Sequence, residues 1–241
     1  MSNMLYPVTE KFFSIQGEGA WTGTPFAFVR LAMCPVGKLT GICTSWDGKE
    51  FICDTGPSYQ SKGKSEWHAY TEINSKETAE HIADWAISAG YQHLCLSGGE
   101  TLSYDLYPFC LWLYEAHKSP TTKTFQIHVE TSGTVVPKIH FEELLTQQQL
   151  GRLWVTLSPK EGWHTKMLRL ANEVKLLVHK DTKEEEIEKW LSVVPPSVHF
   201  YVQPIEDEHW KDNSAQAVFF CRAYPSRVKL SLQTHKLLDV R

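Results

Sequence analysis

The chain has 241 residues, of which 42% are hydrophobic and 22% are charged, and its formal net charge is −4. A globular protein of this length and composition can bury a core without disulfides or a structural metal. The acidic balance disfavours a protein that binds nucleic-acid phosphates through clustered Lys and Arg. No apolar run could span a bilayer, and the N-terminal MSNMLYPVTEKFF does not resemble a signal peptide. We therefore expect a cytoplasmic protein without a membrane or direct nucleic-acid partner.

Apolar patterning predicts strands that alternate with helices along most of the chain. A first strand at 26–31 precedes a long polar loop at about 32–65. Further strands are predicted at 93–96, 124–129, 153–157, 174–178, 198–202 and 228–232. Helices are predicted at 76–88, 106–117, 184–192 and 213–223. This order predicts an α/β fold with a mostly parallel sheet, in a single domain over residues 1–241.

Polar motifs stand where the apolar strands end. They are the loop at 32–55, SGGE at 97–100, ETSG at 130–133, SPK at 158–160 and QPIE at 203–206. Because ligands of parallel sheets bind at the carboxyl ends of the strands, these motifs predict a single active site.

Three of the six cysteines, Cys34, Cys43 and Cys53, crowd into one loop. In a reducing compartment, clustered cysteines more often bind metal than form disulfides. Their spacing is not that of a zinc ribbon, and no fourth ligand stands nearby. Three thiolates suit an iron–sulfur cluster that keeps one iron open to a ligand. Spacing alone does not separate this interpretation from incidental cysteines. The other three cysteines lie in apolar segments and are predicted to be core residues.

Two glycine-containing motifs could contact a ligand. In SIQGEG at 14–19, the glycines allow close backbone approach, while Gln16 and Glu18 offer polar groups that suit the edge of a guanine- or pterin-like ring. In SGGE, Glu100 could bind a charged amine. Either motif alone could be a plain turn.

Taken together and in order, several motifs resemble the 7-carboxy-7-deazaguanine synthase family of radical S-adenosylmethionine enzymes. They are SIQGEG, FVRL at 28–31, CPVG at 34–37, CDT at 53–55, SGGE, SPK and QTHK at 233–236. SIQGEG and CDT are specific to this family, whereas the Gly-Gly-Glu element is shared across the superfamily. The resemblance implies a partial, incomplete TIM-like barrel of the radical S-adenosylmethionine type.

The resemblance also implies a reaction. A 4Fe-4S cluster and S-adenosylmethionine would generate a 5′-deoxyadenosyl radical that abstracts a hydrogen from 6-carboxy-5,6,7,8-tetrahydropterin. The ring would contract to 7-carboxy-7-deazaguanine, a precursor of queuosine-type 7-deazapurines, with loss of ammonia. Mg²⁺ would assist, an electron donor such as flavodoxin or ferredoxin would supply the electron, and the protein would be a homodimer.

On the same resemblance, Cys34, Cys43 and Cys53 would hold the cluster and Thr55 would bind Mg²⁺. The implied substrate contacts are Ile15, Gln16, Gly17, Glu18, Arg30 and Ser97. The implied S-adenosylmethionine contacts are Ile52, Cys53, Asp54, Gly99, Glu100, Ser132, Ser158, Pro159, Lys160 and Gln203.

Two departures from the family pattern stand out. Glu50 occupies the position where a C-x-x-C partner of Cys53 is expected, so Cys43 is assigned to the cluster by elimination. Thr101 follows SGGE where the superfamily generally has proline, and His235 is given no role. Two alternatives stay open: a radical activase that acts on a protein partner, and a non-enzymatic iron–sulfur or zinc module.

Overall fold

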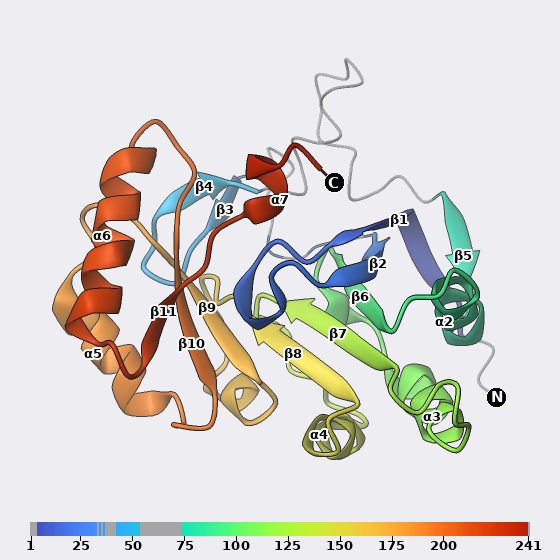
Figure 1. Cartoon of the computed structure of the whole chain (residues 1–241). Helices are drawn as coiled ribbons and strands as arrows, with labels where there is room; N and C mark the ends of the chain where they lie inside the picture. Colours follow the sequence, from blue (N-terminus) through green and yellow to red (C-terminus); the bar gives the residue numbers. More distant parts are fainter. Residues whose placement is uncertain (1–3, 33, 35, 37–41, 54–73, 241) are drawn as a thin grey trace.

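The computed structural model describes residues 4–32, 34, 36, 42–53 and 74–240. In this part of the chain, a nine-stranded sheet has the order β11-β10-β9-β8-β7-β6-β2-β1-β5 (Figure 1). Its strands are β1 (Tyr6–Ile15), β2 (Pro25–Leu31), β5 (Ser75–Glu77), β6 (His93–Gly98), β7 (Gln126–Thr131), β8 (Leu153–Leu157), β9 (Glu173–Val178), β10 (His199–Pro204) and β11 (Val228–Leu230).

The sheet is mostly parallel and does not close. Neighbouring strands from β2 through β6 to β11 pair in parallel, whereas β1 pairs antiparallel with both β2 and β5. The edge strands β5 and β11 end the order without pairing to each other. The expected incomplete TIM-like barrel is therefore confirmed.

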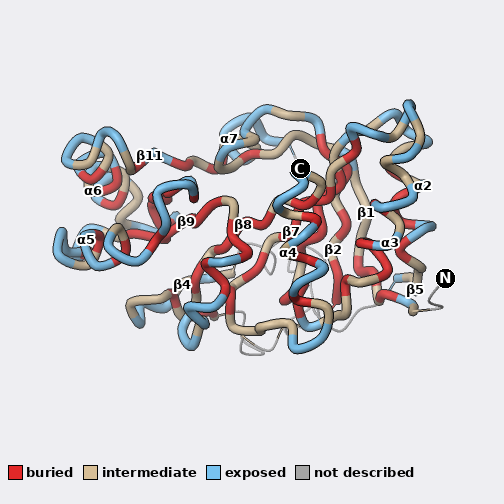
Figure 2. Tube along the Cα trace, turned by 90° about the horizontal axis from the view of Figure 1, so that it is seen from below, coloured by how far each residue is buried: buried red, intermediate tan, exposed pale blue. Residues whose placement is uncertain are grey.

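Helices cover the outer face of the sheet. They are α2 (Ala79–Ser88), α3 (Tyr107–Ala116), α4 (Phe141–Gln149), α5 (Glu184–Val193) and α6 (Trp210–Ala223), and the short α7 (Thr234–Leu237) follows near the C-terminus (Figure 1). Apolar strand residues such as Leu94, Leu96 and Val129 are buried in one core with residues of these helices. Buried positions accordingly follow the strands, and exposed positions follow the helix surfaces (Figure 2). The alternate strand residues face the barrel interior.

Aromatic and histidine side chains fill the interior at the amino ends of the strands. Trp21, in the short 3-10 helix Gly19–Trp21, contacts the rings of His93, His128 and Trp154 at centroid distances of 4.9 to 5.5 Å. His93 Nδ1 and His128 Nε2 are hydrogen-bonded at 3.1 Å. Burial lowers the pKa of His128 well below its ordinary value and also lowers the pKa of His93, which favours the neutral form of both rings. Ligand access is therefore expected at the opposite, carboxyl ends of the strands.

The predicted strands and helices form with boundaries that shift by up to three residues. The prediction of a helix from residue 76 was wrong at its start: Ser75–Glu77 form edge strand β5 beside β1, and the helix begins at Ala79. Thr78 caps it, accepting a hydrogen bond from the His81 backbone N–H at 3.2 Å.

The prediction of a loop over residues 32–65 was also wrong in part. Strands β3 (Ile42–Thr44) and β4 (Glu50–Ile52) form an antiparallel hairpin separate from the main sheet. Its turn is closed by a hydrogen bond from Gly48 N to Ser45 O at 3.1 Å, and Gly48 adopts a φ of 85°, which glycine tolerates. The sequence also gave no prediction of β1, α4 or α7.

No helix among the described residues has both the length and the apolar composition that crossing a bilayer requires. All six cysteines are free thiols, so none is taken up in a disulfide.

Candidate active site

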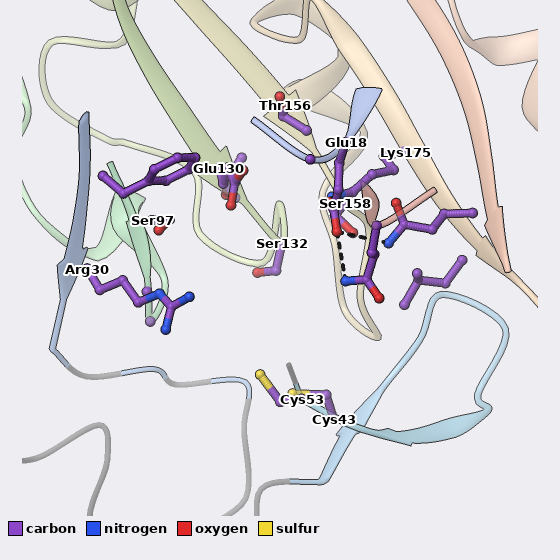
Figure 3. A pocket seen from close by; sticks show the side chains of 18 of the residues that line it. Glu18, Arg30, Cys43, Cys53, Ser97, Glu130, Ser132, Thr156, Ser158 and Lys175 are labelled. Carbon is purple, nitrogen blue, oxygen red and sulfur yellow. Dashed lines mark hydrogen bonds and ion pairs between the residues drawn. The ribbon is translucent and has the colours of Figure 1, made fainter. Parts of the chain in front are cut away.

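One pocket lies at the carboxyl ends of the parallel strands (Figure 3). All of the polar motifs contribute to its wall, which confirms that they converge. The predicted site residues that line it are Ile15, Gln16, Gly17, Glu18, Arg30, Cys34, Cys43, Cys53, Ser97, Gly99, Glu100, Ser132, Ser158, Lys160 and Gln203. Two others, Ile52 and Pro159, are not among its lining residues, and Ile52 is 66% exposed. Asp54 and Thr55 lie outside the described residues.

The three clustered cysteines meet at one wall of the pocket. Cys34 follows β2, Cys43 lies in β3 opposite Phe51, and Cys53 comes directly after β4. Figure 3 shows Cys43 and Cys53 next to each other, and their thiols share a hydrogen bond. This hydrogen bond and burial raise the pKa of the Cys43 thiol, as do the neighbouring Cys53 and Cys34, whereas Lys160 lowers it.

The three thiols at this wall are compatible with an iron–sulfur cluster. Within the described ranges, no group of three Cys, His, Asp or Glu side chains could hold one metal ion. In an iron–sulfur cluster each thiolate binds a different iron, so three thiols at a shared wall are suitable ligands. The donor set is sulfur alone, which such clusters prefer. The residues present therefore fit a cluster held by three thiolates.

Glu18 is held at the pocket wall by a set of donors. It forms a buried ion pair with Lys175 in β9 (Figure 3). Its Oε1 accepts hydrogen bonds from Gln203 Nε2 at 3.2 Å and from Gln233 Nε2 at 2.8 Å. Burial lowers the pKa of Lys175 to about 8. These contacts fix the orientation of the Glu18 side chain, which also lines the pocket.

A second buried carboxyl group, Glu130, lies at the end of β7. Gln16 Nε2 donates to its Oε1 at 3.3 Å, and Cys95 hydrogen-bonds to it inside the barrel. Burial raises the pKa of Glu130, while Gln16, Arg30 and Cys95 act in the opposite direction. A carboxyl group with a raised pKa beside a ligand pocket is suited to taking up or releasing a proton.

The glycines of SIQGEG are required by the protein's own packing. A Cβ on Gly17 would lie 1.9 Å from His235 Nδ1, and Gly17 O accepts hydrogen bonds from Thr234 N and Oγ1, each at 3.0 Å. Gly19 adopts a φ of 65°, and a Cβ there would lie 2.4 Å from Glu173 Oε1. The close approach expected at these glycines is therefore made by protein side chains in this structure.

The SGGE and ETSG motifs are joined by Glu100. Its buried carboxylate accepts hydrogen bonds from Leu102 N at 3.1 Å, Thr131 Oγ1 at 2.6 Å and Ser132 N at 2.8 Å, and also from the Ser132 hydroxyl. Thr101, which replaces the expected proline, begins a 3-10 helix and leaves this bracing intact. Glu100 thus lines the pocket as the brace between two strand ends.

Arg30, near the end of β2, also lines the pocket. Its Nη1 is 2.6 Å from Glu10 Oε1, and its guanidinium lies over the Phe12 ring at 5.2 Å. In the segment after β8, Lys160 Nζ donates to Ser158 Oγ at 3.2 Å. Both cations thus have fixed orientations at the pocket.

Seven polar pocket residues were missed by the sequence predictions: Glu130, Thr131, Thr156, Lys175, Gln233, His235 and Lys236. Glu130 begins the ETSG motif, so its place at a strand end could have revealed it. A lone Lys inside the apolar segment EVKLLV was the signal for Lys175. Gln233 and His235 belong to QTHK, and their position depends on how the C-terminal segment folds back onto Gly17.

Known proteins of similar sequence show the family to which this chain belongs. The chain is 30% identical over 239 residues to the 7-carboxy-7-deazaguanine synthase of Synechocystis sp., which covers 98% of this chain and 94% of the relative. The chain belongs to the 7-carboxy-7-deazaguanine synthase family. The synthase of Escherichia coli (strain K12) is 30% identical over 256 residues, covering 98% of this chain and 100% of the relative. No family model matches the chain.

A solved structure agrees with this assignment. The crystal structure of QueE from Escherichia coli superposes with a TM-score of 0.64 at 28% sequence identity and covers 96% of this chain and 95% of that chain. The resemblance to the synthase family seen in the motifs is thus confirmed over nearly the full length.

Proposed function

We propose that this chain converts 6-carboxy-5,6,7,8-tetrahydropterin to 7-carboxy-7-deazaguanine with loss of ammonia, as a lyase in the formation of queuosine precursors. Relatives named 7-carboxy-7-deazaguanine synthase match this chain over 94% and 100% of their own length. The observation that carries the proposal is the convergence of SIQGEG, the three cysteines and SGGE at one pocket.

We assign Cys34, Cys43 and Cys53 as ligands of a 4Fe-4S cluster with one open iron. When bound, the cluster and S-adenosylmethionine supply the radical that removes a hydrogen from the substrate. The residues proposed to bind S-adenosylmethionine come from the cluster loop, SGGE, ETSG, SPK and β10. Lys160 brings a positive charge beside Cys43 in that part of the pocket. This charge favours the thiolate form that binds iron.

The chain's own residues orient the substrate and manage protons. A guanidinium suits bidentate pairing with a carboxylate, so Arg30 is assigned to the substrate carboxylate. Gln16, Glu18 and the backbone of Ile15 and Gly17 are assigned to the ring edge. The Glu130 carboxyl group, next to Gln16, is placed to exchange a proton with the ring during the loss of ammonia.

The remaining parts of the proposal rest on sequence motifs and family membership. Thr55 of the CDT motif is assigned to Mg²⁺, which prefers oxygen ligands. We further propose that a flavodoxin or ferredoxin supplies the electron and that the protein is a cytoplasmic homodimer.

Anaerobic turnover tests the proposal. The purified chain is reconstituted with iron and sulfide and supplied with reductant, S-adenosylmethionine, Mg²⁺ and 6-carboxytetrahydropterin. Mass spectrometry should detect 7-carboxy-7-deazaguanine, with one ammonia released for each product molecule. Cleavage of S-adenosylmethionine that a protein stimulates and the pterin does not would instead favour the activase alternative.

A further inference from the structure

The hairpin β3–β4 carries Cys43 and places Cys53 at its end, yet its own ladder is short. It consists of three residue pairs, Ile42 with Ile52, Cys43 with Phe51 and Thr44 with Glu50. It forms a two-stranded sheet of its own, apart from the main sheet. An isolated two-stranded hairpin is marginally stable in water. The position of these two thiols therefore depends on what the hairpin packs against.

The tip of the hairpin docks through Trp46. Its indole N–H donates to the Leu177 carbonyl in β9 at 2.9 Å. Its ring meets Trp190 of α5 edge to face, with centroids 5.8 Å apart, and Trp190 stacks in turn on Trp163 at 4.6 Å. Aromatic pairs of this kind stabilise a contact beyond the effect of the area that they bury.

Polar contacts hold the same tip from a second side. Asp47 Oδ2 lies 3.0 Å from His179 Nε2, just beyond β9, and the two side chains are 7% and 15% exposed. The Ser45 hydroxyl donates to the other Asp47 oxygen, Oδ1. Thr44 O accepts a hydrogen bond from Glu161 N at 3.0 Å, next to the SPK motif. The hairpin is thus fixed between β9, α5 and the loop after β8.

We propose that Trp46 and Asp47 are positioning residues for the iron–sulfur cluster. They dock the hairpin tip so that Cys43 and Cys53 lie near Cys34 at one wall of the pocket. The segment between Cys43 and Cys53, which gives this chain its unusual cysteine spacing, is the one that builds the turn and the docking tip. The inference rests on the proposed function only in its assignment of the cluster, since the docking contacts are those of the protein alone.

The test uses Trp46→Ala, with Trp85→Ala in α2 as the matched control. Its first readout needs no cluster: the rate at which iodoacetamide alkylates Cys43 in the apoprotein, mapped by mass spectrometry relative to Cys110 in α3. Both cysteines are 4% exposed, so global unfolding raises both rates and leaves their ratio unchanged. Undocking should raise the ratio about tenfold, the change that corresponds to 1.4 kcal/mol. The second readout is iron bound per chain after reconstitution, which should fall to less than half of the wild-type value.

An unchanged alkylation ratio in Trp46→Ala, or a raised ratio with wild-type iron content, would overturn the proposal. If Trp46→Ala does not fold, Asp47→Asn, which preserves the shape of the side chain, is measured in the same two ways and decides the question. Failure of the wild-type chain to take up iron would count against the proposed function, while the alkylation ratio would still report on docking.

Discussion

At the scale of single residues, the barrel interior contains an ion pair in which each charge is stabilised by the other. Lys175 and Glu18 form a buried pair, and Gln203 and Gln233 complete the hydrogen bonds of the carboxylate. Burial of one charge without its partner is strongly unfavourable. The pair therefore links the integrity of the SIQGEG loop to β9.

Lys175→Met should destabilise the folded protein by about 3 kcal/mol, at the lower end for breaking a buried pair, because Gln203 and Gln233 still donate to Glu18. The free energy of unfolding in urea measures this. The double variant with Glu18→Gln should recover part of the loss. The exposed Lys229→Met on β11 should change stability by less than about 0.5 kcal/mol, and an equal loss there would contradict the argument.

His128 makes stability depend on acid pH. Burial lowers its pKa in the folded state, so below pH 6.5, its ordinary value, the unfolded chain binds a proton that the folded chain does not. The free energy of unfolding should therefore fall as the pH drops from 7 to 5. His128→Gln should flatten this dependence, whereas His81→Gln at an exposed position should retain it. A slope that is unchanged in His128→Gln would exclude this residue as the cause.

Sequence reasoning found the site residues that belong to motifs and missed those set by tertiary structure. Gln16, Arg30 and Ser97 each stand in a motif at the end or beginning of a strand, so the pattern located them. Lys175 lies within β9 and faces the pocket only because the sheet curves into a partial barrel. Its partner is 157 positions away in the chain, a distance over which no local pattern operates.

At the scale of elements, Glu173 in β9 contacts the SIQGEG loop and the residue that follows it. This carboxylate accepts hydrogen bonds from Ala20 N at 2.9 Å and Thr156 Oγ1 at 2.8 Å. Burial raises its pKa, and the nearby Glu130 adds to this effect. The turn at Gly19 fits directly against it, so loop conformation and barrel interior are coupled.

Two glycines between β1 and β2, Gly19 and Gly23, allow the effect of steric contact to be measured apart from that of backbone strain. Gly19 and Gly23 both have positive φ, but a Cβ on Gly23 would meet nothing within 4 Å. Each Ala substitution should cost about 1–2 kcal/mol for the left-handed backbone. Gly19→Ala should cost more, because its Cβ would meet Glu173 Oε1. Urea unfolding measures both, and equal losses would show that the contact with Glu173 does not matter.

Helices and strands were predicted best where their apolar residues follow a regular sequence pattern. Strand β8 was predicted with its observed boundaries because LWVTL is a compact apolar segment. Helix α4 (FEELLTQQQ) was missed because it buries few apolar side chains and begins after His140, which has a φ of 58° and does not cap it through its side chain. Strand β1 was missed because YPVTEKFFSI lacks regular alternation, and it forms by antiparallel pairing with β2.

At the scale of the whole molecule, the open barrel leaves the carboxyl ends of its strands accessible to a cofactor. If the cluster anchors S-adenosylmethionine, ligand binding should stabilise only the reconstituted protein. At about 100 times the Kd, the ligand adds roughly 2.7 kcal/mol, which raises Tm by about 5–10 °C for a chain of this size. Differential scanning calorimetry under anaerobic conditions measures this, and an equal shift in the cluster-free chain would contradict the proposed anchoring.

The three thiols at the pocket are expected to support synthase activity. The most direct test is the yield of 7-carboxy-7-deazaguanine from 6-carboxytetrahydropterin, measured by mass spectrometry after anaerobic reconstitution of the wild-type chain, Cys43→Ala and Cys110→Ala. Cys110 is buried in α3 and does not line the pocket, so it serves as the matched control. We expect product from the wild-type chain and from Cys110→Ala, and none from Cys43→Ala. Product from Cys43→Ala at the wild-type rate, or its absence from a fully reconstituted wild-type chain, would contradict the claim.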